Sequence, residues 1–330
     1  MEQLGKSGTL DLLPTLGPVV RNIAAHAFLG EDFRRRLGSK FFSDFRLFSG
    51  GMEPVFPLWL PLPRLIRSQK AKRILHTVLG ELIVQRRREP VDPPDFLQTL
   101  IATRDSDGRP IDDFFIINLI LLLVWAGHET TAGHISWGLI DLLQHPAYLQ
   151  SVRDEQADIL GDSRELSMTD VRRLQRIDWA LKETERLHPV AFVLMRKATQ
   201  TFARQGFQVP QGAMVLVAPC VSHRMPDVFS DPHQYRPERF SSEHSEHDES
   251  SQPHRLIGFG GGVHRCAGVN FAYLEMKIVL SFLLQHYEFT LLDPHPQPAR
   301  GAVTKWPASP CRVQYRRRVN ICQKTARQMS

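Results

Sequence analysis

A stretch of ten residues constrains this chain more than any other, because it sets a single cysteine in a glycine-rich backbone. Phe259 to Gly268 reads Phe-Gly-Gly-Gly-Val-His-Arg-Cys-Ala-Gly, and the residues that follow have the pattern of a helix beginning right behind Cys266. Unpaired N–H groups and the positive dipole end at a helix N-terminus stabilise a thiolate. Glycines let a large flat ligand approach the backbone. The pattern predicts that Cys266 is the thiolate ligand of a haem iron that cleaves dioxygen.

Other interpretations of the same loop are simpler. A lone cysteine is most often a small buried hydrophobe. A glycine-rich loop before a helix can also hold phosphate, but it then requires Lys-Ser/Thr after the glycines, and that pair is absent here. The four cysteines, Cys220, Cys266, Cys311 and Cys322, have no paired spacing. A disulfide framework or a zinc site is therefore not expected, and a reducing compartment is.

The amino-acid composition excludes a disordered or fibrous protein and fits a globular one. The 330 residues are 42% hydrophobic and 23% charged, as in soluble globular proteins. The net charge of +6 comes from scattered or short basic runs, which fit either an acidic partner protein or a solvated face. No nucleic-acid-binding motif is present. The apolar segment Phe114 to Gly127 is too short to span a bilayer, so we expect the first half of a long buried helix and no membrane segment.

Periodicity predicts a mainly α-helical chain with small β-sheets. Three or four amphipathic helices are expected between residues 10 and 91, with a break near Gly50-Gly51. The strand-turn-strand pattern of residues 207–217 and the tail 287–318 predict β-hairpins, and the polar segment 241–255 predicts a solvated loop. The other expected helices span residues 95–103, 111–144, 147–160, a short segment capped by Ser167, 178–187 and a last one that ends near His286.

The middle of the long helix carries the polar motif Ala-Gly-His-Glu-Thr-Thr at residues 126–131. Gly127 lowers helix stability by about 1 kcal/mol relative to alanine, which suits a helix pressed against a flat cofactor. Thr130 could then donate a hydrogen bond to bound dioxygen, and Glu129 could help to relay protons to it. The alternative is a threonine bonded to its own helix beside a satisfied buried acid.

Two further motifs contain charged side chains that we expect to stabilise the fold. Glu183 and Arg186 lie three residues apart on one helical face and can pair. Arg239, in Tyr-Arg-Pro-Glu-Arg-Phe, offers a second guanidinium for the same carboxylate. An acid buried between two arginines indicates a fold-stabilising triad and not a catalytic dyad.

These four motifs, in this order and over nearly the whole chain, resemble the cytochrome P-450 haem-thiolate monooxygenases. The resemblance implies a single domain over residues 1–330 that lacks the N-terminal sheet and first helices of the family fold. It implies that Cys266 is the iron ligand, that Glu129 and Thr130 lie above the haem, and that Arg196 pairs with a haem propionate. Phe259, Gly262 and Gly268 would shape the cysteine loop, and Glu183, Arg186 and Arg239 would form the structural triad.

Within the family the chain is most similar to the bacterial sterol 14-alpha-demethylases. His264 stands at a propionate-binding position where most members carry arginine and this subgroup carries histidine. The demethylases usually place histidine before the central threonine, whereas this chain has Glu129, the general monooxygenase pattern. A related hydroxylase is therefore equally compatible. Trp125, Ala191, Phe192 and Val193 match substrate-lining positions of the relatives, or are simply core residues.

The resemblance implies a reaction in which one oxygen atom of O2 enters a lipophilic substrate such as a sterol, terpenoid or fatty acid. The implied cofactor is haem b, with electrons from NAD(P)H through a ferredoxin or flavoprotein reductase, and the expected location is cytoplasmic. Two alternatives are a truncated, non-catalytic haem-binding remnant and a haem-thiolate peroxygenase or isomerase that needs no electron partner.

Overall fold

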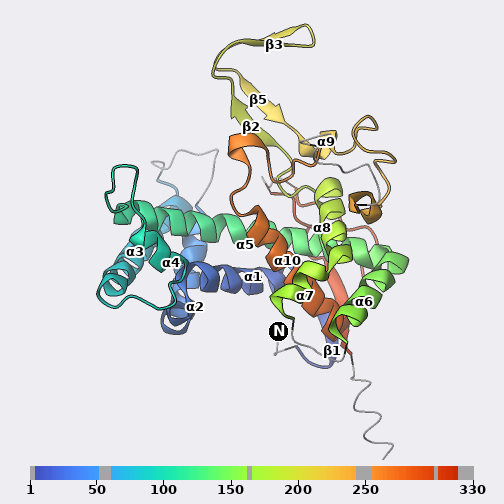
Figure 1. The fold of residues 1–330 in the computed structure, drawn as a ribbon, viewed down its shortest axis with the longest axis horizontal. Helices are drawn as coiled ribbons and strands as arrows, with labels where there is room; N and C mark the ends of the chain where they lie inside the picture. Colours follow the sequence, from blue (N-terminus) through green and yellow to red (C-terminus); the bar gives the residue numbers. More distant parts are fainter. Residues whose placement is uncertain (1–3, 52–60, 162–165, 243–254, 301–303, 319–330) are drawn as a thin grey trace, which may run out of the picture. The chain divides into compact units, whose positions relative to one another are not determined.

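The computed structural model describes residues 4–51, 61–161, 166–242, 255–300 and 304–318, and for residues 32 and 34–39 the backbone alone. Most of the expected polar loop 241–255, together with Cys322, lies outside these ranges. The described chain is mainly α-helical, as the periodicity predicts (Figure 1). Its α-helices are α1 Leu12–Leu29, α2 Glu31–Ser49, α3 Pro63–Arg88, α4 Phe96–Ala102, α5 Asp113–Gln144, α6 Pro146–Leu160, α7 Met168–Arg173, α8 Gln175–Leu187, α9 Pro219–Ser222 and α10 Val269–His286. Two short 3-10 turns, η1 Pro237–Phe240 and η3 Gly262–His264, complete the set used below.

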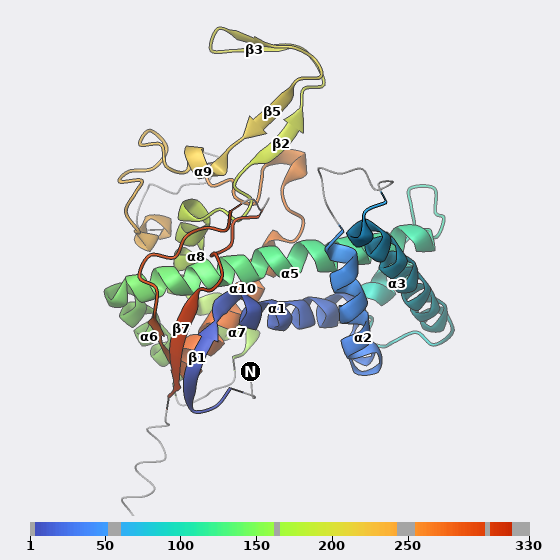
Figure 2. The same ribbon diagram turned by 180° about the vertical axis from the view of Figure 1, so that it is seen from behind.

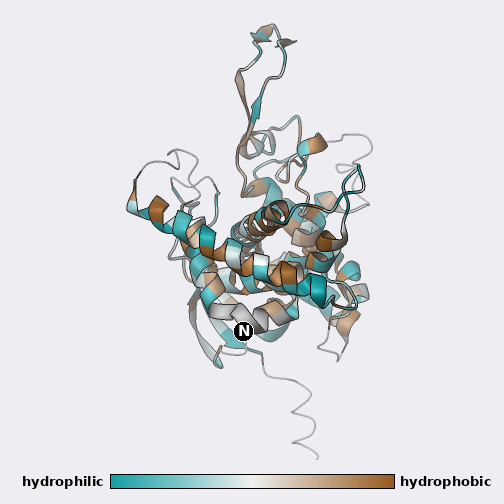
Figure 3. Ribbon diagram, turned by 90° about the vertical axis from the view of Figure 1, so that its left-hand side faces the viewer, coloured by the Kyte–Doolittle hydropathy of each residue, from teal (hydrophilic) through white to brown (hydrophobic). Residues whose placement is uncertain are grey.

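The chain divides into two compact units, one of residues 18–129 and one of residues 1–17 with 130–330. The smaller unit is held by an aromatic cluster in which Phe33, Phe41 and Phe45 of α2 are buried. From α3, Leu75, Leu79 and Ile83 enter the cluster at the spacing of one helical face. Figure 3 shows hydrophilic and hydrophobic residues interspersed along the helices. This packing supplies the apolar contacts that order α2 and α3.

The core of the larger unit is the second half of α5, where every residue from 131 to 142 is buried. Helices α6, α8 and α10 pack against one another, and Figure 1 shows them grouped around this part of α5. By length and composition α5 is also apolar enough to cross a membrane, and 39% of its most apolar window is buried inside the described structure. A core helix of a soluble protein has the same composition, and the run 131–142 fits that environment.

A three-stranded antiparallel sheet joins the two ends of the described chain (Figure 2). Strand β1, Ser7–Asp11, pairs with β7, Arg312–Arg317, which also pairs with β6, Tyr287–Leu291. The first helix begins at Leu12, close to the start predicted near residue 10, and a strand that the periodicity did not predict precedes it. Its partner lies some 300 residues away, so local patterning carries no trace of the pairing.

The predicted hairpin of residues 207–217 was wrong in its pairing, although both strands exist. Strand β4, Phe207–Val209, pairs with β3, Phe202–Arg204, while β5, Met214–Val217, pairs with β2, Leu194–Lys197. The reason is a tight turn in which Gln205 and Gly206 both have positive φ, 49° and 81°, as a two-residue hairpin loop requires. In residues 287–318 the expected antiparallel pairing is present: β6 pairs with β7, and a further antiparallel bridge joins Pro298 to Pro307 within the connection between them.

Candidate active site

The cysteine loop is a compact turn whose shape depends on glycine. Gly260 and Gly262 have φ of 76° and 60°, a region that other residues rarely adopt. The Cys266 amide donates to the Phe259 carbonyl oxygen at 2.8 Å, which closes the loop, and α10 begins three residues later at Val269. The structure therefore confirms the helix expected directly behind Cys266.

Residues 262–266 of the loop, which include the cysteine, are exposed. Cys266 is exposed, and the apolar side chain of Val263 is 96% exposed. A Cβ atom added at Gly262 would meet nothing within 4 Å. An exposed thiol on an apolar, open loop fits a large flat apolar group, because binding that group removes the apolar surface from water. These residues thus fit a haem that is bound through Cys266.

The Phe259 end of the loop packs against α5 and α10. The ring of Phe259 stacks on His134 of α5, with centroids 6.2 Å apart, and contacts Tyr273 of α10 at 5.3 Å. His134 is buried, its Nε2 lies 2.9 Å from the Leu181 carbonyl oxygen, and burial lowers its pKa to about 4. Because His134 follows Thr130 by four residues, Thr130 lies on the same face of α5, one turn before the contact with the loop.

Glu129 and Thr130 differ in their surroundings from the buried helix that follows them. Thr130 is exposed, and the Glu129 side chain is 42% exposed. The Glu129 carboxylate lies 3.8 Å from Nε2 of His128, whose ring is buried beside Phe45. Burial lowers the pKa of His128, while the nearby Glu129 carboxylate opposes that change. The acid is thus accessible and has a histidine neighbour.

The structure brings Glu183, Arg186 and Arg239 together. Arg186 donates two hydrogen bonds of 2.8 Å to the two carboxylate oxygens of Glu183, and Arg239 Nε lies 3.1 Å from the same carboxylate. The backbone N–H of Arg236 donates to Glu183 Oε1 at 2.7 Å. These groups are excluded from water and join α8 to η1, as a structural role requires.

The remaining expected site residues are dispersed. Arg196 is half-buried on β2, where its Nη1 donates to the Met195 carbonyl oxygen at 2.9 Å, and His264 is exposed at the end of η3. The Phe192 ring lies 4.8 Å from Lys305 Nζ. Trp125 packs partly buried against the aromatic cluster of the smaller unit. Ala191 and Val193 are half-buried on the segment leading into β2.

Sequence reasoning missed Glu185 and Tyr273, which meet beneath the cysteine loop. Glu185 is buried between the two triad members of α8, and it accepts a 2.5 Å hydrogen bond from the Tyr273 hydroxyl group. A weak signal was available, since four consecutive positions of α8, residues 183–186, are polar, and two of them suffice for the predicted ion pair.

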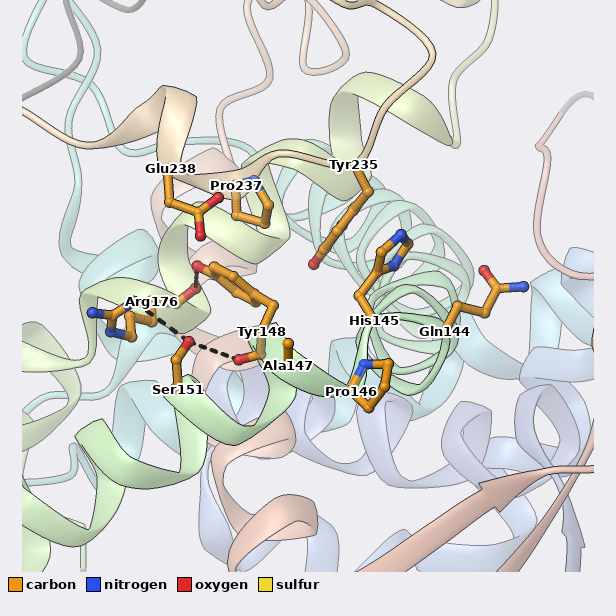
Figure 4. Close-up of a pocket in the computed structure, with 10 residues that line it drawn as sticks. All are labelled: Gln144, His145, Pro146, Ala147, Tyr148, Ser151, Arg176, Tyr235, Pro237 and Glu238. Carbon is orange, nitrogen blue, oxygen red and sulfur yellow. Dashed lines mark hydrogen bonds between the residues drawn. The ribbon is translucent and has the colours of Figure 1, made fainter.

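A surface pocket of about 510 Å³ lies elsewhere, where α5 ends and α6 begins (Figure 4). Tyr235 and Tyr148 line it, and the His145 ring stacks on Tyr235 at 4.3 Å. The Tyr148 hydroxyl donates to the Arg176 carbonyl oxygen. None of the site residues expected from the sequence lines this pocket, so it is separate from the candidate haem site.

Comparison with known proteins agrees with this geometry. The family model described as Cytochrome P450 matches residues 2–310. The sterol 14alpha-demethylase of Mycolicibacterium vanbaalenii is 33% identical, over 97% of this chain and 72% of the relative. The human lanosterol 14-alpha demethylase is 29% identical over 96% of this chain and 62% of its own length.

A solved structure, retinoic acid bound cyanobacterial CYP120A1, superimposes with a TM-score of 0.86 at 31% identity, covering 96% of this chain and 72% of that one. The fold, the cysteine loop and these relatives agree on one assignment. The chain belongs to the cytochrome P450 family of monooxygenases.

Proposed function

We propose that this protein is a haem-thiolate monooxygenase that inserts one oxygen atom from O2 into a sterol-like lipophilic substrate. The observation that carries the proposal is the exposed Cys266 on an uncovered, apolar glycine loop, beside the face of α5 that bears Thr130. The substrate class rests on the sterol demethylases among its relatives. The proposed unit is a single domain over residues 1–330, with a cytoplasmic location.

Each residue then has a distinct task around haem b. Cys266 would hold the iron, and Arg196 and His264 would pair with the propionates, which are carboxylates that favour cationic partners. The bound haem supplies the activation of O2. Thr130 offers a hydroxyl group to the oxygen-binding face, and Glu129 moves protons between solvent and that hydroxyl. Trp125, Ala191, Phe192 and Val193 are proposed as substrate contacts.

Electrons are proposed to come from NAD(P)H through a ferredoxin or a flavoprotein reductase. Glu129 favours this route over a peroxygenase, because the acid and Thr130 suit proton delivery to O2. Turnover with the reductase and not with peroxide is the expected result. Turnover with peroxide alone would assign the peroxygenase reaction.

The ligand assignment is tested with the purified chain loaded with haem. After reduction and addition of carbon monoxide, we expect the red-shifted Soret band of a thiolate-ligated haem, and Cys266→Ser should abolish it. Cys220→Ser, at a half-buried cysteine outside the loop, is the matched control and should retain the band. A band that survives Cys266→Ser would refute the assignment, and no band in the unaltered chain would favour a non-catalytic remnant.

A panel of sterols, terpenoids and fatty acids then tests the substrate class by spectral shifts of the haem. A shift with sterols alone supports the proposal. Product analysis separates demethylation from hydroxylation, which Glu129 leaves open.

A further inference from the structure

Glu185 is buried without taking part in the ion pair that surrounds it in sequence. It is 4% exposed, and it lies on α8 between Glu183 and Arg186, which pair with each other. Its carboxylate accepts hydrogen bonds from the Tyr273 hydroxyl group and from the backbone N–H groups of Gly258 and Phe259. The fold supplies three hydrogen-bond donors to this buried carboxylate, and without them its burial would be strongly destabilising.

These bonds end at the start of the cysteine loop. Phe259 donates its N–H to Glu185, and its carbonyl oxygen accepts the N–H of Cys266 at 2.8 Å. One residue therefore links the carboxylate of α8 to the cysteine. Gly258 permits the close approach, since a Cβ atom there would lie 2.5 Å from Glu185 Cγ.

Tyr273 completes the arrangement from the other side. It lies on α10, seven residues after Cys266, and its ring contacts Phe259 and His134. The loop is thus fixed at both of its ends, by α8 at Phe259 and by the start of α10 behind Cys266. Burial raises the pKa of Glu185 to about 7, and its three hydrogen-bond donors together with the charge of Lys182 oppose that rise.

We propose that Glu185 and Tyr273 form a clamp that positions the Cys266 loop and tunes electron donation from Cys266 to the iron through Phe259. The positioning part stands on the chain alone, and the tuning part rests on the proposed haem-thiolate function. Above pH 7, where the Glu185 carboxylate is mostly ionised, its negative charge two hydrogen bonds from the ligand residue disfavours the extra electron on the iron and so lowers the reduction potential. Glu185 and Tyr273 are positioning residues in this scheme, since neither touches a reacting atom.

The first test uses the haem-free chain and amide hydrogen exchange of a peptide that covers residues 256–268. Glu185→Gln keeps the size of the side chain but leaves one of the two backbone amides without an acceptor. We expect exchange in this peptide to be faster by about tenfold or more, and Tyr273→Phe to give a smaller increase in the same peptide.

The matched control is Glu275→Gln, which replaces a second buried glutamate, on α10. Neither Glu275 carboxylate oxygen has a hydrogen-bond partner among the described residues, so this change should leave loop exchange unaccelerated. Unchanged exchange in both Glu185→Gln and Tyr273→Phe would overturn the clamp. If Glu185→Gln does not fold, Tyr273→Phe decides the outcome alone.

The second test uses the haem-loaded chain and its reduction potential. Glu185→Gln should shift the potential upward and convert part of the carbon monoxide band to the form without thiolate, while Glu275→Gln should do neither at neutral pH. Equal potentials in the two variants and the unaltered protein would remove the tuning part. Failure of the unaltered chain to bind haem would refute the proposed function, while the exchange experiment would still test the clamp.

Discussion

Arg186 and Glu183 meet in a two-bond fork from which water is excluded, since both side chains are 0% exposed. The rest of the Arg186 guanidinium donates to backbone carbonyl oxygens of His223, Pro232 and Gln234. A single side chain thereby ties α8 to the long irregular segment that follows α9. Arginine suits this position because its five donors form a rigid, planar fork.

Arg186→Lys should therefore destabilise the fold although it keeps the charge. An ammonium group cannot reproduce the fork and leaves buried carbonyl groups without donors, and breaking a buried pair costs about 3–5 kcal/mol. The measurement is the free energy of unfolding in urea. Arg316→Lys, in an exposed pair with Glu288, is the control and should change little. Equal effects of the two substitutions would contradict a structural role for the triad.

Glu275→Gln should stabilise the protein increasingly as the pH rises. Burial raises the pKa of Glu275 to about 8, so the folded chain holds a proton that the unfolded chain releases above pH 4.5. Stability is therefore lost as pH rises from 4.5 to 8, by roughly 2–4 kcal/mol, and glutamine removes that loss. Urea unfolding at pH 5 and pH 9 checks this. A constant difference between variant and unaltered protein at both pH values would show that Glu275 titrates normally.

His223→Gln should flatten the acid side of the stability curve. The His223 ring is neutral, because Nε2 accepts the N–H of Ile257 while Nδ1 faces the Arg186 carbonyl oxygen. Burial lowers its pKa to about 4, so the unfolded chain binds a proton that the folded chain refuses. Stability is lost as pH falls from 6.5 towards 4, on the order of 3 kcal/mol.

This prediction concerns the difference in the free energy of unfolding between His223→Gln and the unaltered protein at each pH. The opposite slope from Glu275 overlaps it between pH 4.5 and 6.5. The amide of the introduced glutamine can keep both hydrogen bonds of His223 without binding a proton. Parallel stability curves from pH 7 to pH 4.5 would contradict the prediction.

Local patterns predicted those elements whose cause is local. The cap of α7 at Ser167, the long α5 and the start of α10 behind Cys266 each depend on residues within one or two turns, and the structure contains all three. The Glu183–Arg186 pair is likewise set by helical spacing. These features follow from the spacing of residues along a helix and from its capping residues, both of which can be read from the sequence.

Long-range partners could not be predicted in the same way. The pairing of β1 with β7, and the contact between Glu185 and Tyr273, join residues 88 or more positions apart. Which strand or donor a segment meets depends on how the whole core packs, and a single sequence does not display it. Trp125 illustrates the same point, since its apolar surface fits an aromatic cluster as well as a substrate pocket.

Thr130→Val should uncouple oxygen consumption from product formation while leaving the fold intact. Valine has the shape and χ1 preference of threonine, so α5 and the stacking of Phe259 on His134 should persist. The lost hydroxyl group removes the proposed proton donor at the oxygen-binding face, and product formed per O2 consumed should fall on the order of tenfold or more. Thr131→Val is the matched control, because Thr131 is the next residue of α5 and is buried in the core. Measuring product and O2 together distinguishes the cases: an unchanged ratio in Thr130→Val, or an equal fall in Thr131→Val, would assign Thr130 to the helix and not to catalysis.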